Sequence, residues 1–261
     1  MLANLPANES IVIVSVVRDY AMYNRCIAHN PFANSHVLQA IDNRTANEHI
    51  STHYNHFLES YNYAVPAWFI FCHEDFEIQQ ALGPLFGALD KTALYGPIGA
   101  KTSPRYFGLF HAWQLLGQIT ESNKDGSNPR FIGKPVPAGT LIETFDCQCL
   151  IIHSELFRTT GLRFDDHLSF DLYIEDFCMQ AKESFNIPSR ILPLVCQHWS
   201  GGKVSERYYQ QEKYVNAKYP NCCYTGTSSY SLGNPPLLRR FNDHFKRFLL
   251  KFVRSVKAIN H

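Results

Sequence analysis

Hydrophobic runs alternate with amphipathic segments along the first hundred residues of the chain. Residues 11–17 (IVIVSVV) form a continuous, largely β-branched run, which is typical of a strand buried on both faces of a parallel sheet. Further runs predict strands at 36–41, 67–72 and 93–98, with helices between them at 20–28, 46–60 and 78–89. Strands that alternate with helices predict βαβ units and therefore an α/β fold with a mostly parallel sheet.

The second half of the chain is less regular. Residues 121–139 are rich in Ser, Asn, Gly, Lys and Pro and predict a surface loop. We expect strands within 140–153 and 189–197, and helices at 172–184 and 206–219. These patterns predict a main domain over residues 1–220, a turn-rich linker at 221–236 and a cationic amphipathic helix at 237–261.

Composition narrows the classes of function. The formal net charge is only +1, so the whole molecule does not attract nucleic acid, and we expect no nucleic-acid partner. The 8 cysteines have no CxxC spacing and lie mostly in apolar runs, which predicts reduced, buried thiols. The N-terminus has no signal-peptide pattern, and no apolar run approaches the ~20 residues of a membrane span. We therefore expect a cytoplasmic protein.

Acidic residues follow three of the predicted strands. Asp19, Asp42 and Asp75 each come just after a strand end, where ligands bind in open α/β sheets. In His73-Glu74-Asp75, period-two alternation places His73 and Asp75 on one side and Glu74 on the other. An acid at this position can bind a hard divalent cation. A solvated turn explains the same three residues equally well.

Two more segments carry candidate chemistry. Glu175 and Asp176 are neighbours near the start of a predicted helix, so their side chains diverge by about 100° and can perform different tasks, one of them that of a general base. The alternative is that both only stabilise the helix N-terminus. His198 ends an apolar run before Trp-Ser-Gly-Gly, which fits a metal ligand or a core histidine with satisfied hydrogen bonds.

The order of these segments is more specific than any one of them. Over about residues 10–220 the chain resembles the family-2 glycosyltransferases of the GT-A fold, in particular their "glycosyltransferase-like" relatives. This resemblance implies a Rossmann-like, mostly parallel central sheet flanked by helices. It rests on eight segments in family order: IVIVSVVRDY, HVLQAIDNR, STHYNHFLE, FIFCHEDFE, LYGPIGAK, TFDCQCLIIHSELF, FDDHLSFDLYIEDFCMQAKESFNI and VCQHWSGG.

The resemblance also implies a role for each site residue. Asp176 would be the catalytic base, with Glu175 beside it. A divalent metal, Mn²⁺ or Mg²⁺, would be held at the DxD-like position, where His73 replaces the first acid and puts metal dependence in doubt; the implied ligands are His73, Asp75 and His198. The nucleotide-sugar would be bound by Asp42, Asn43, Arg44, Asn55, Glu74 and Asp146.

These roles imply transfer of a sugar from a UDP- or GDP-sugar to a hydroxyl of a glycan, lipid-linked or polysaccharide acceptor, with inversion at the anomeric carbon. Two alternatives stay open. A nucleotidyltransferase usually has a Gly-rich loop after the first strand, whereas SVVRDYAMYN has no glycine. A non-catalytic module that binds nucleotide-sugar or glycan is favoured by His73 and opposed by the Glu175-Asp176 pair. The C-terminal helix fits an anionic membrane surface, which would be the inner face of the membrane, or docking on protein.

Overall fold

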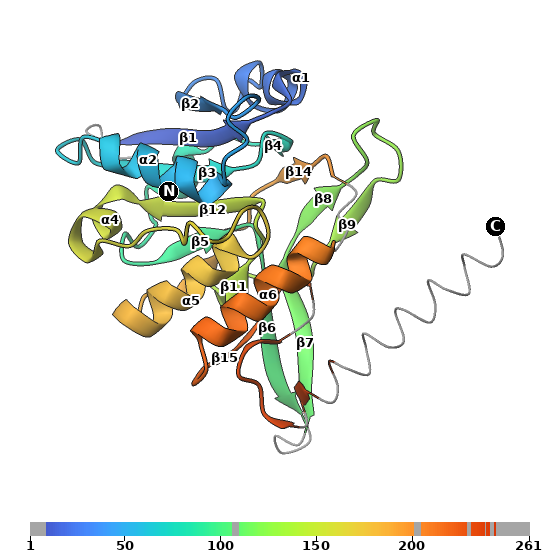
Figure 1. Ribbon diagram of the computed structural model, residues 1–261. Helices are drawn as coiled ribbons and strands as arrows, with labels where there is room; N and C mark the ends of the chain where they lie inside the picture. Colours follow the sequence, from blue (N-terminus) through green and yellow to red (C-terminus); the bar gives the residue numbers. More distant parts are fainter. Residues whose placement is uncertain are drawn as a thin grey trace.

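A seven-stranded sheet forms the centre of the molecule (Figure 1). The computed structural model describes residues 9–105, 110–200, 205–228, 231–237, 239–240 and 243. Within these residues the order of the strands is β10-β13-β5-β12-β3-β1-β2. Their bounds are β1 Ser10–Val17, β2 Val37–Asp42, β3 Ala67–Cys72, β5 Leu94–Gly96, β10 Leu141–Ile142, β12 Cys149–His153 and β13 Ser189–Ile191.

The sheet is mixed, whereas the hydrophobic pattern predicts a mostly parallel one. β1 runs parallel to β2 and β3, and β5 runs parallel to β13, as βαβ units require. β12, however, is antiparallel to both of its neighbours, β3 and β5. A parallel partner needs a crossover connection, usually a helix. The described chain between β5 and β12 contains strands and no helix.

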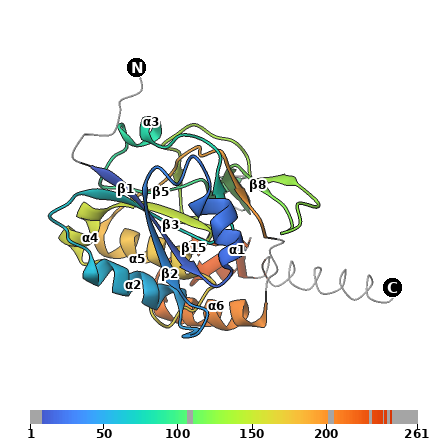
Figure 2. The same cartoon turned by 90° about the horizontal axis from the view of Figure 1, so that it is seen from above.

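Helices cover both faces of this sheet, as the α/β pattern predicts (Figure 2). One face packs on α2 (Ile50–Ser60), α4 (Ser154–Thr160) and α5 (Tyr173–Phe185). The other packs on α1 (Tyr20–Tyr23), the π-helix η1 (Asn24–Ala28) and α3 (Gly83–Phe86). Successive side chains of a strand point to opposite faces. In β1, for example, Val12 and Val14 join the first core while Ile11 and Ile13 join the second.

Shorter strands extend the molecule beyond the main sheet. They form three groups in the described residues: β11-β6-β7, β4-β14-β8-β9 and the hairpin β15-β16. Helix α6 (Glu206–Lys218) follows β14, as predicted for 206–219. The strand bounds are β4 Phe76–Ile78, β6 Ile98–Arg105, β7 Phe110–Gly117, β8 Ile119–Glu121, β9 Arg130–Ile132, β11 Thr144–Phe145, β14 Cys196–His198, β15 Cys223–Thr225 and β16 Ser231–Gly233.

Four predicted elements differ from the structure. The helix predicted at 78–89 is reduced to α3, which has Pro84 in its first turn. The strand predicted at 189–197 is divided into β13 and β14 around Pro193, which has no N–H to donate to a ladder. The predicted loop at 121–139 contains β9, and the turn-rich segment at 221–236 contains the hairpin β15-β16. The domain boundaries themselves remain a prediction.

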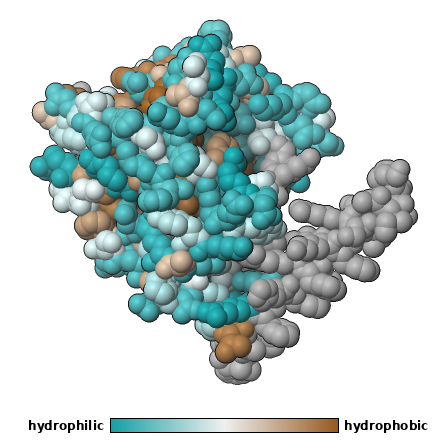
Figure 3. Space-filling model, viewed as in Figure 1, coloured by the Kyte–Doolittle hydropathy of each residue, from teal (hydrophilic) through white to brown (hydrophobic). Residues whose placement is uncertain are grey.

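The state of the cysteines and the hydropathy of the surface can be compared with what the composition predicts. All eight cysteines are free thiols; five are buried as predicted, whereas Cys147, Cys222 and Cys223 are only partly buried. The face seen in Figure 1 is mostly hydrophilic, and hydrophobic side chains on it are scattered (Figure 3). No helix among the described residues is long and apolar enough to cross a membrane. The predicted C-terminal helix lies outside the described residues, apart from 237, 239, 240 and 243.

Candidate functional site

A cavity of about 590 Å³ lies at the carboxyl ends of β1, β2 and β3, where open α/β sheets bind their ligands. Its wall also includes the loop before α5, the first turn of that helix, and the end of β14. Of the eleven residues that the sequence predicts for the site, seven line this cavity: Asn43, His73, Glu74, Asp75, Asp146, Glu175 and His198. The other four, Asp42, Arg44, Asn55 and Asp176, do not.

The three predicted metal ligands come together in this cavity. His73, Asp75 and His198 each offer a ligand atom, and these atoms lie within 4.8 Å of one another. The chain builds this group by pairing β14 antiparallel to β4, which places His198 opposite Phe76 and next to Asp75. The Trp199 N–H donates to the Asp75 carbonyl over 2.9 Å and fixes this register. Two imidazoles and a carboxylate form a group that can hold a divalent metal ion.

His198 is a buried base between two acids. Its Nε2 lies 3.3 Å from Asp75 Oδ1 and its Nδ1 lies 3.8 Å from Glu121 Oε1. Although burial opposes the charged form, these carboxylates raise the pKa of His198 to about 9. Both ring nitrogens are buried, and neither of these two contacts has the geometry of a hydrogen bond. Buried polar atoms without a partner are rare in folded proteins, and a metal ion would supply one. The residues present therefore fit the metal that the sequence predicts.

His73 is held as a neutral imidazole. Burial lowers the pKa of His73 to about 4. Its Nε2 lies 3.1 Å from the Tyr173 hydroxyl, which donates its own proton to the Cys147 carbonyl over 2.6 Å. Because the Tyr173 oxygen can then only accept, His73 carries its proton on Nε2 and leaves Nδ1 with a free lone pair. Hydrogen bonds of this kind orient metal-ligating histidines.

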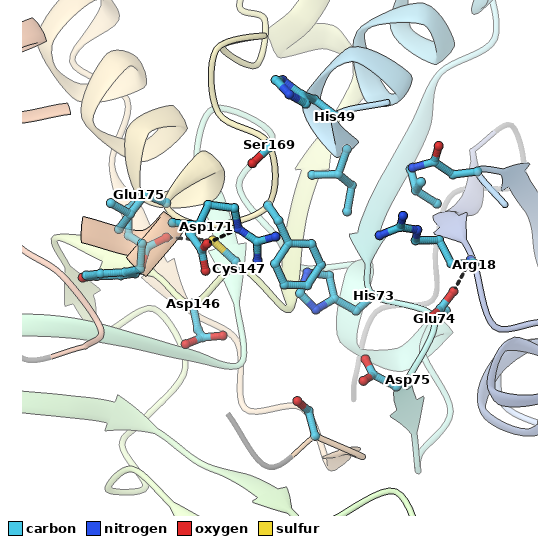
Figure 4. Close-up of a pocket in the computed structure, with 18 of the residues that line it drawn as sticks. Arg18, His49, His73, Glu74, Asp75, Asp146, Cys147, Ser169, Asp171 and Glu175 are labelled. Atoms are coloured by element: carbon cyan, nitrogen blue, oxygen red, sulfur yellow. Dashed lines mark hydrogen bonds and ion pairs between the residues drawn. The ribbon is translucent and has the colours of Figure 1, made fainter. Parts of the chain in front are cut away.

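Asp146 and Glu175 lie on one side of the metal group, opposite Arg18 and Glu74 (Figure 4). Glu175 is buried in the cavity wall and only 2% exposed. It accepts hydrogen bonds from Cys147 Sγ and Thr227 Oγ1, both at 2.9 Å. Burial, helped by the negative charge of Asp146, raises the pKa of Glu175 to about 7. A carboxyl group with this pKa can accept a proton near neutral pH, as a general base must.

Asp176, which the family resemblance implies as the catalytic base, is held in an ion pair with Lys218. Its side chain does not line the cavity, and both carboxylate oxygens accept from Lys218 Nζ, at 2.8 and 2.9 Å. The same ammonium binds Asp165 Oδ2 at 2.6 Å. Adjacent helical residues point about 100° apart, so only one of the two acids can face the cavity, and that acid is Glu175.

On the side of the cavity opposite Glu175, Glu74 links two strand ends by hydrogen bonds. One oxygen of its carboxylate accepts from the backbone N–H groups of Arg18 and Asp19, at 2.5 and 2.9 Å. Glu74 thus ties the end of β3 to the end of β1, and it faces away from the metal group, as period-two alternation predicts. The Arg18 side chain lines the cavity and donates to Asn47 Oδ1. A cation is therefore held on this side.

Three of the residues predicted to bind the nucleotide lie elsewhere. Asp42 and Arg44 form an exposed ion pair with Nη2 and Oδ2 2.6 Å apart, outside the cavity. Asn55 is buried in α2, where it donates to the Phe164 carbonyl and to Asp166 Oδ1 and accepts from the Phe164 N–H. These bonds join α2 to the loop that precedes α5. In this structure Asn55 shapes the cavity indirectly, while Asn43 lines it.

Comparisons with known proteins add little to this geometry. No family model matches the chain, and no curated protein matches it. Among solved structures it is similar to the crystal structure of GalNAc-T7 with UDP, GalNAc and Mn²⁺, with a TM-score of 0.46 and 11% sequence identity. The match covers 79% of this chain and 48% of that one, so the chain spans about half of that protein's length. A likeness this distant assigns neither a family nor an activity.

Sequence reasoning missed several residues of the site. Glu121, beside His198, lies at the start of a segment whose composition is that of a loop. Thr227, which contacts Glu175, lies in the segment predicted as a linker. Arg207 lines the cavity from α6 and binds Asp171 over 2.6 Å. No local pattern identifies these three, because each reaches the cavity only through packing of distant segments. Arg18 had a signal, since it directly follows the first strand.

Proposed function

We propose that the chain is a glycosyltransferase that moves a sugar from a nucleotide-sugar to an acceptor hydroxyl. The observation that carries the proposal is that one cavity contains a group suited to a divalent metal and a buried carboxyl group with a pKa near neutrality. A nucleotide-sugar needs stabilisation of the diphosphate that departs, and the acceptor needs a base. The eight family-like segments support a family-2-like enzyme of the GT-A fold.

The diphosphate of the donor would be held at the metal group. His73, Asp75 and His198 would ligate the ion, which would neutralise charge that develops on the departing diphosphate. Two imidazoles among three ligands disfavour Mg²⁺, which prefers oxygen ligands, so Mn²⁺ is the ion to test first. Arg18 and Asn43 line the side of the cavity opposite Glu175 and would contact the rest of the nucleotide. UDP- and GDP-sugars are the donors to test.

Glu175, in place of Asp176, is the proposed catalytic base. Its ionised carboxylate would take the proton of the acceptor hydroxyl, and the oxygen would attack the anomeric carbon as the nucleoside diphosphate leaves. A single displacement of this kind inverts the anomeric configuration. Hydrogen bonds from Cys147 and Thr227 hold the carboxylate in place at the cavity wall. Asp146, which also lines the cavity, would bind a hydroxyl of the donor or acceptor sugar.

The acceptor and the location of the protein are further proposals that the sequence supports. A glycan or lipid-linked acceptor would place the enzyme in polysaccharide biosynthesis. A cytoplasmic location, with the cationic segment at residues 237–261 touching an anionic membrane surface, is consistent with such an acceptor. Liposome co-sedimentation with and without residues 237–261 tests this part separately, and equal partitioning of the two forms would contradict it.

The activity is tested by a screen of UDP- and GDP-sugars with the full chain. We expect release of UDP or GDP from one donor in the presence of Mn²⁺, and loss of this release when a chelator removes the metal. Binding of a donor without any turnover would instead favour a non-catalytic module. Release of pyrophosphate from a nucleoside triphosphate and a sugar phosphate would identify a nucleotidyltransferase. Either result would contradict the proposal.

A further inference from the structure

A second group of metal-type ligands lies on the surface of α2, apart from the cavity's metal group. Glu48, His53 and His56 each offer a ligand atom, and these atoms lie within 4.8 Å of one another. His53 and His56 are three residues apart on the helix, so their side chains share one face. Glu48 approaches from the turn before the helix, with Oε2 3.8 Å from His53 Nε2. The group shares no residue with His73, Asp75 and His198.

His53 is the residue that distinguishes this group from an ordinary polar surface. It is 8% exposed, and its Nε2 is buried without a hydrogen-bond partner. That nitrogen faces the Glu48 carboxylate but is too far from it for a hydrogen bond. Glu48 and His56 are exposed, so their side chains can move to close the distance. An ion bound between the three side chains would supply the partner that His53 Nε2 lacks.

The backbone that carries the three side chains is firmly held. Asn43 and Glu48 exchange two hydrogen bonds, from Asn43 Nδ2 to the Glu48 carbonyl and from the Glu48 N–H to Asn43 Oδ1, both at 2.9 Å. Ser51 Oγ donates to the Leu168 carbonyl at 2.6 Å and anchors the first turn of α2. Ligands on rigid elements need little reorganisation to bind an ion.

We propose that Glu48, His53 and His56 bind a transition-metal ion of the zinc class on the surface of α2. Two imidazoles and one carboxylate are a ligand set that zinc uses when one coordination position stays open to water or to another ligand. Mg²⁺ and Ca²⁺ do not match it, because both prefer oxygen ligands. Glu48 also lines the cavity, so the ion would lie beside the segment that contains Asn43 and Glu48, on the side where we propose that the nucleotide binds.

The test is a zinc titration of the full chain against a chromophoric chelator, with variants that separate the two groups. His56→Ala removes an exposed ligand, Glu48→Gln removes the carboxylate, and His198→Ala removes the cavity group. His29→Ala is the matched control for loss of one histidine. We expect His56→Ala and Glu48→Gln to lose one equivalent of zinc, or to bind it at least about tenfold more weakly, while His29→Ala and His198→Ala keep this equivalent.

Cobalt(II) supplies a second readout, because its absorption spectrum reports its ligands. The α2 site predicts a spectrum without a thiolate charge-transfer band, and its intensity should fall in His56→Ala. Zinc uptake by His56→Ala and Glu48→Gln that equals the wild type in number and affinity would overturn the proposal. A thiolate band on the equivalent lost from these variants would also overturn it, because that band would assign the ion to cysteines.

Discussion

Glu175 and Asp176 are neighbours in sequence, yet they belong to two different regions of the molecule. Glu175 borders the cavity, where two neutral donors hold it and the charge of Asp146 opposes its ionisation. Asp176 lies on the other side of the helix, where Lys218 binds both of its oxygens and also joins it to Asp165. The carboxylate of Glu175 therefore borders the cavity without a cationic partner among the described residues, while that of Asp176 is held in an ion pair.

The difference shows that a candidate base can be identified as a buried carboxyl group that has no cationic partner. Burial raises the pKa of both groups. At Asp176 the ammonium of Lys218 partly offsets the burial by pairing with the carboxylate. Among the described residues no cation pairs with Glu175, so the carboxyl group stays basic at a cost in stability. Stability given up at one site in this manner is common where a group must react.

The largest expected effect is on turnover. Glu175→Gln keeps the shape of the side chain and one of its two acceptor oxygens but removes the base, so we expect donor turnover to fall by about 10²–10⁴-fold. Binding of the nucleotide should persist, because the metal group is untouched. Steady-state assays of Glu175→Gln and Asp176→Asn, corrected for the folded fraction, check this. A larger loss of turnover in Asp176→Asn than in Glu175→Gln would contradict the assignment of Glu175 as the base.

The next effect is on the pH dependence of stability. Because burial raises the pKa of Glu175 from 4.5 to about 7, the folded chain keeps a proton that the unfolded chain has released between these pH values. The contribution of protonated Glu175 to the free energy of unfolding is fully present below about pH 4.5 and is lost as the pH rises through 7. Relative to wild type, Glu175→Gln should therefore gain up to about 3 kcal/mol in its free energy of unfolding between pH 5 and pH 8.

Urea unfolding at the two pH values measures this gain, with the exposed Glu59→Gln as control. A constant difference between wild type and Glu175→Gln would show that Glu175 titrates alike in the folded and unfolded chain. The same proton predicts that kcat/KM falls as the pH drops below about 7, because the base must be ionised to work.

A smaller effect is expected on the other side of the helix. Asp176→Asn leaves Lys218 with Asp165 as its remaining partner, and we expect the free energy of unfolding to fall by about 2 kcal/mol. A double-mutant cycle with Lys218→Met, followed by urea unfolding, isolates the interaction of the pair. Additive effects of the two changes would mean that the ion pair contributes nothing beyond the separate residues.

The smallest effect is on the affinity for metal. Tyr173→Phe keeps the ring but removes the hydroxyl that fixes the proton of His73, so we expect about tenfold weaker binding of Mn²⁺. Tyr214→Phe removes a hydroxyl bound to Asp165, away from the metal group, and serves as control. Calorimetry of Mn²⁺ binding compares the two, and equal affinities would remove Tyr173 from the site.

Much of the core could be predicted from the sequence. The run at 11–17 and the segment at 67–72 become the central strands β1 and β3, because long apolar runs have few other places to go. The direction of β12 could not be predicted, since it depends on strands β6 to β11 that have weak local patterns. Short strands of this kind are fixed by their partners and not by their own composition.

The site was predictable in its composition but less so in its orientation. His73, Asp75 and His198 were predicted together and do meet. The choice between Glu175 and Asp176 was not accessible, because Lys218, 42 residues further along, decides which acid is paired. Asp42 ends its strand near the cavity residues, but Arg44, two residues away, binds it outside the cavity.

The central claim is that the cavity holds a nucleotide-sugar through a metal at His73, Asp75 and His198. Calorimetric titration of UDP- and GDP-sugars into wild type and Asp75→Ala, with and without Mn²⁺, tests it most directly. We predict that one donor binds wild type only when Mn²⁺ is present, and that Asp75→Ala loses this binding while staying folded. Equal affinity in the two proteins, or binding that is indifferent to Mn²⁺, would contradict the claim.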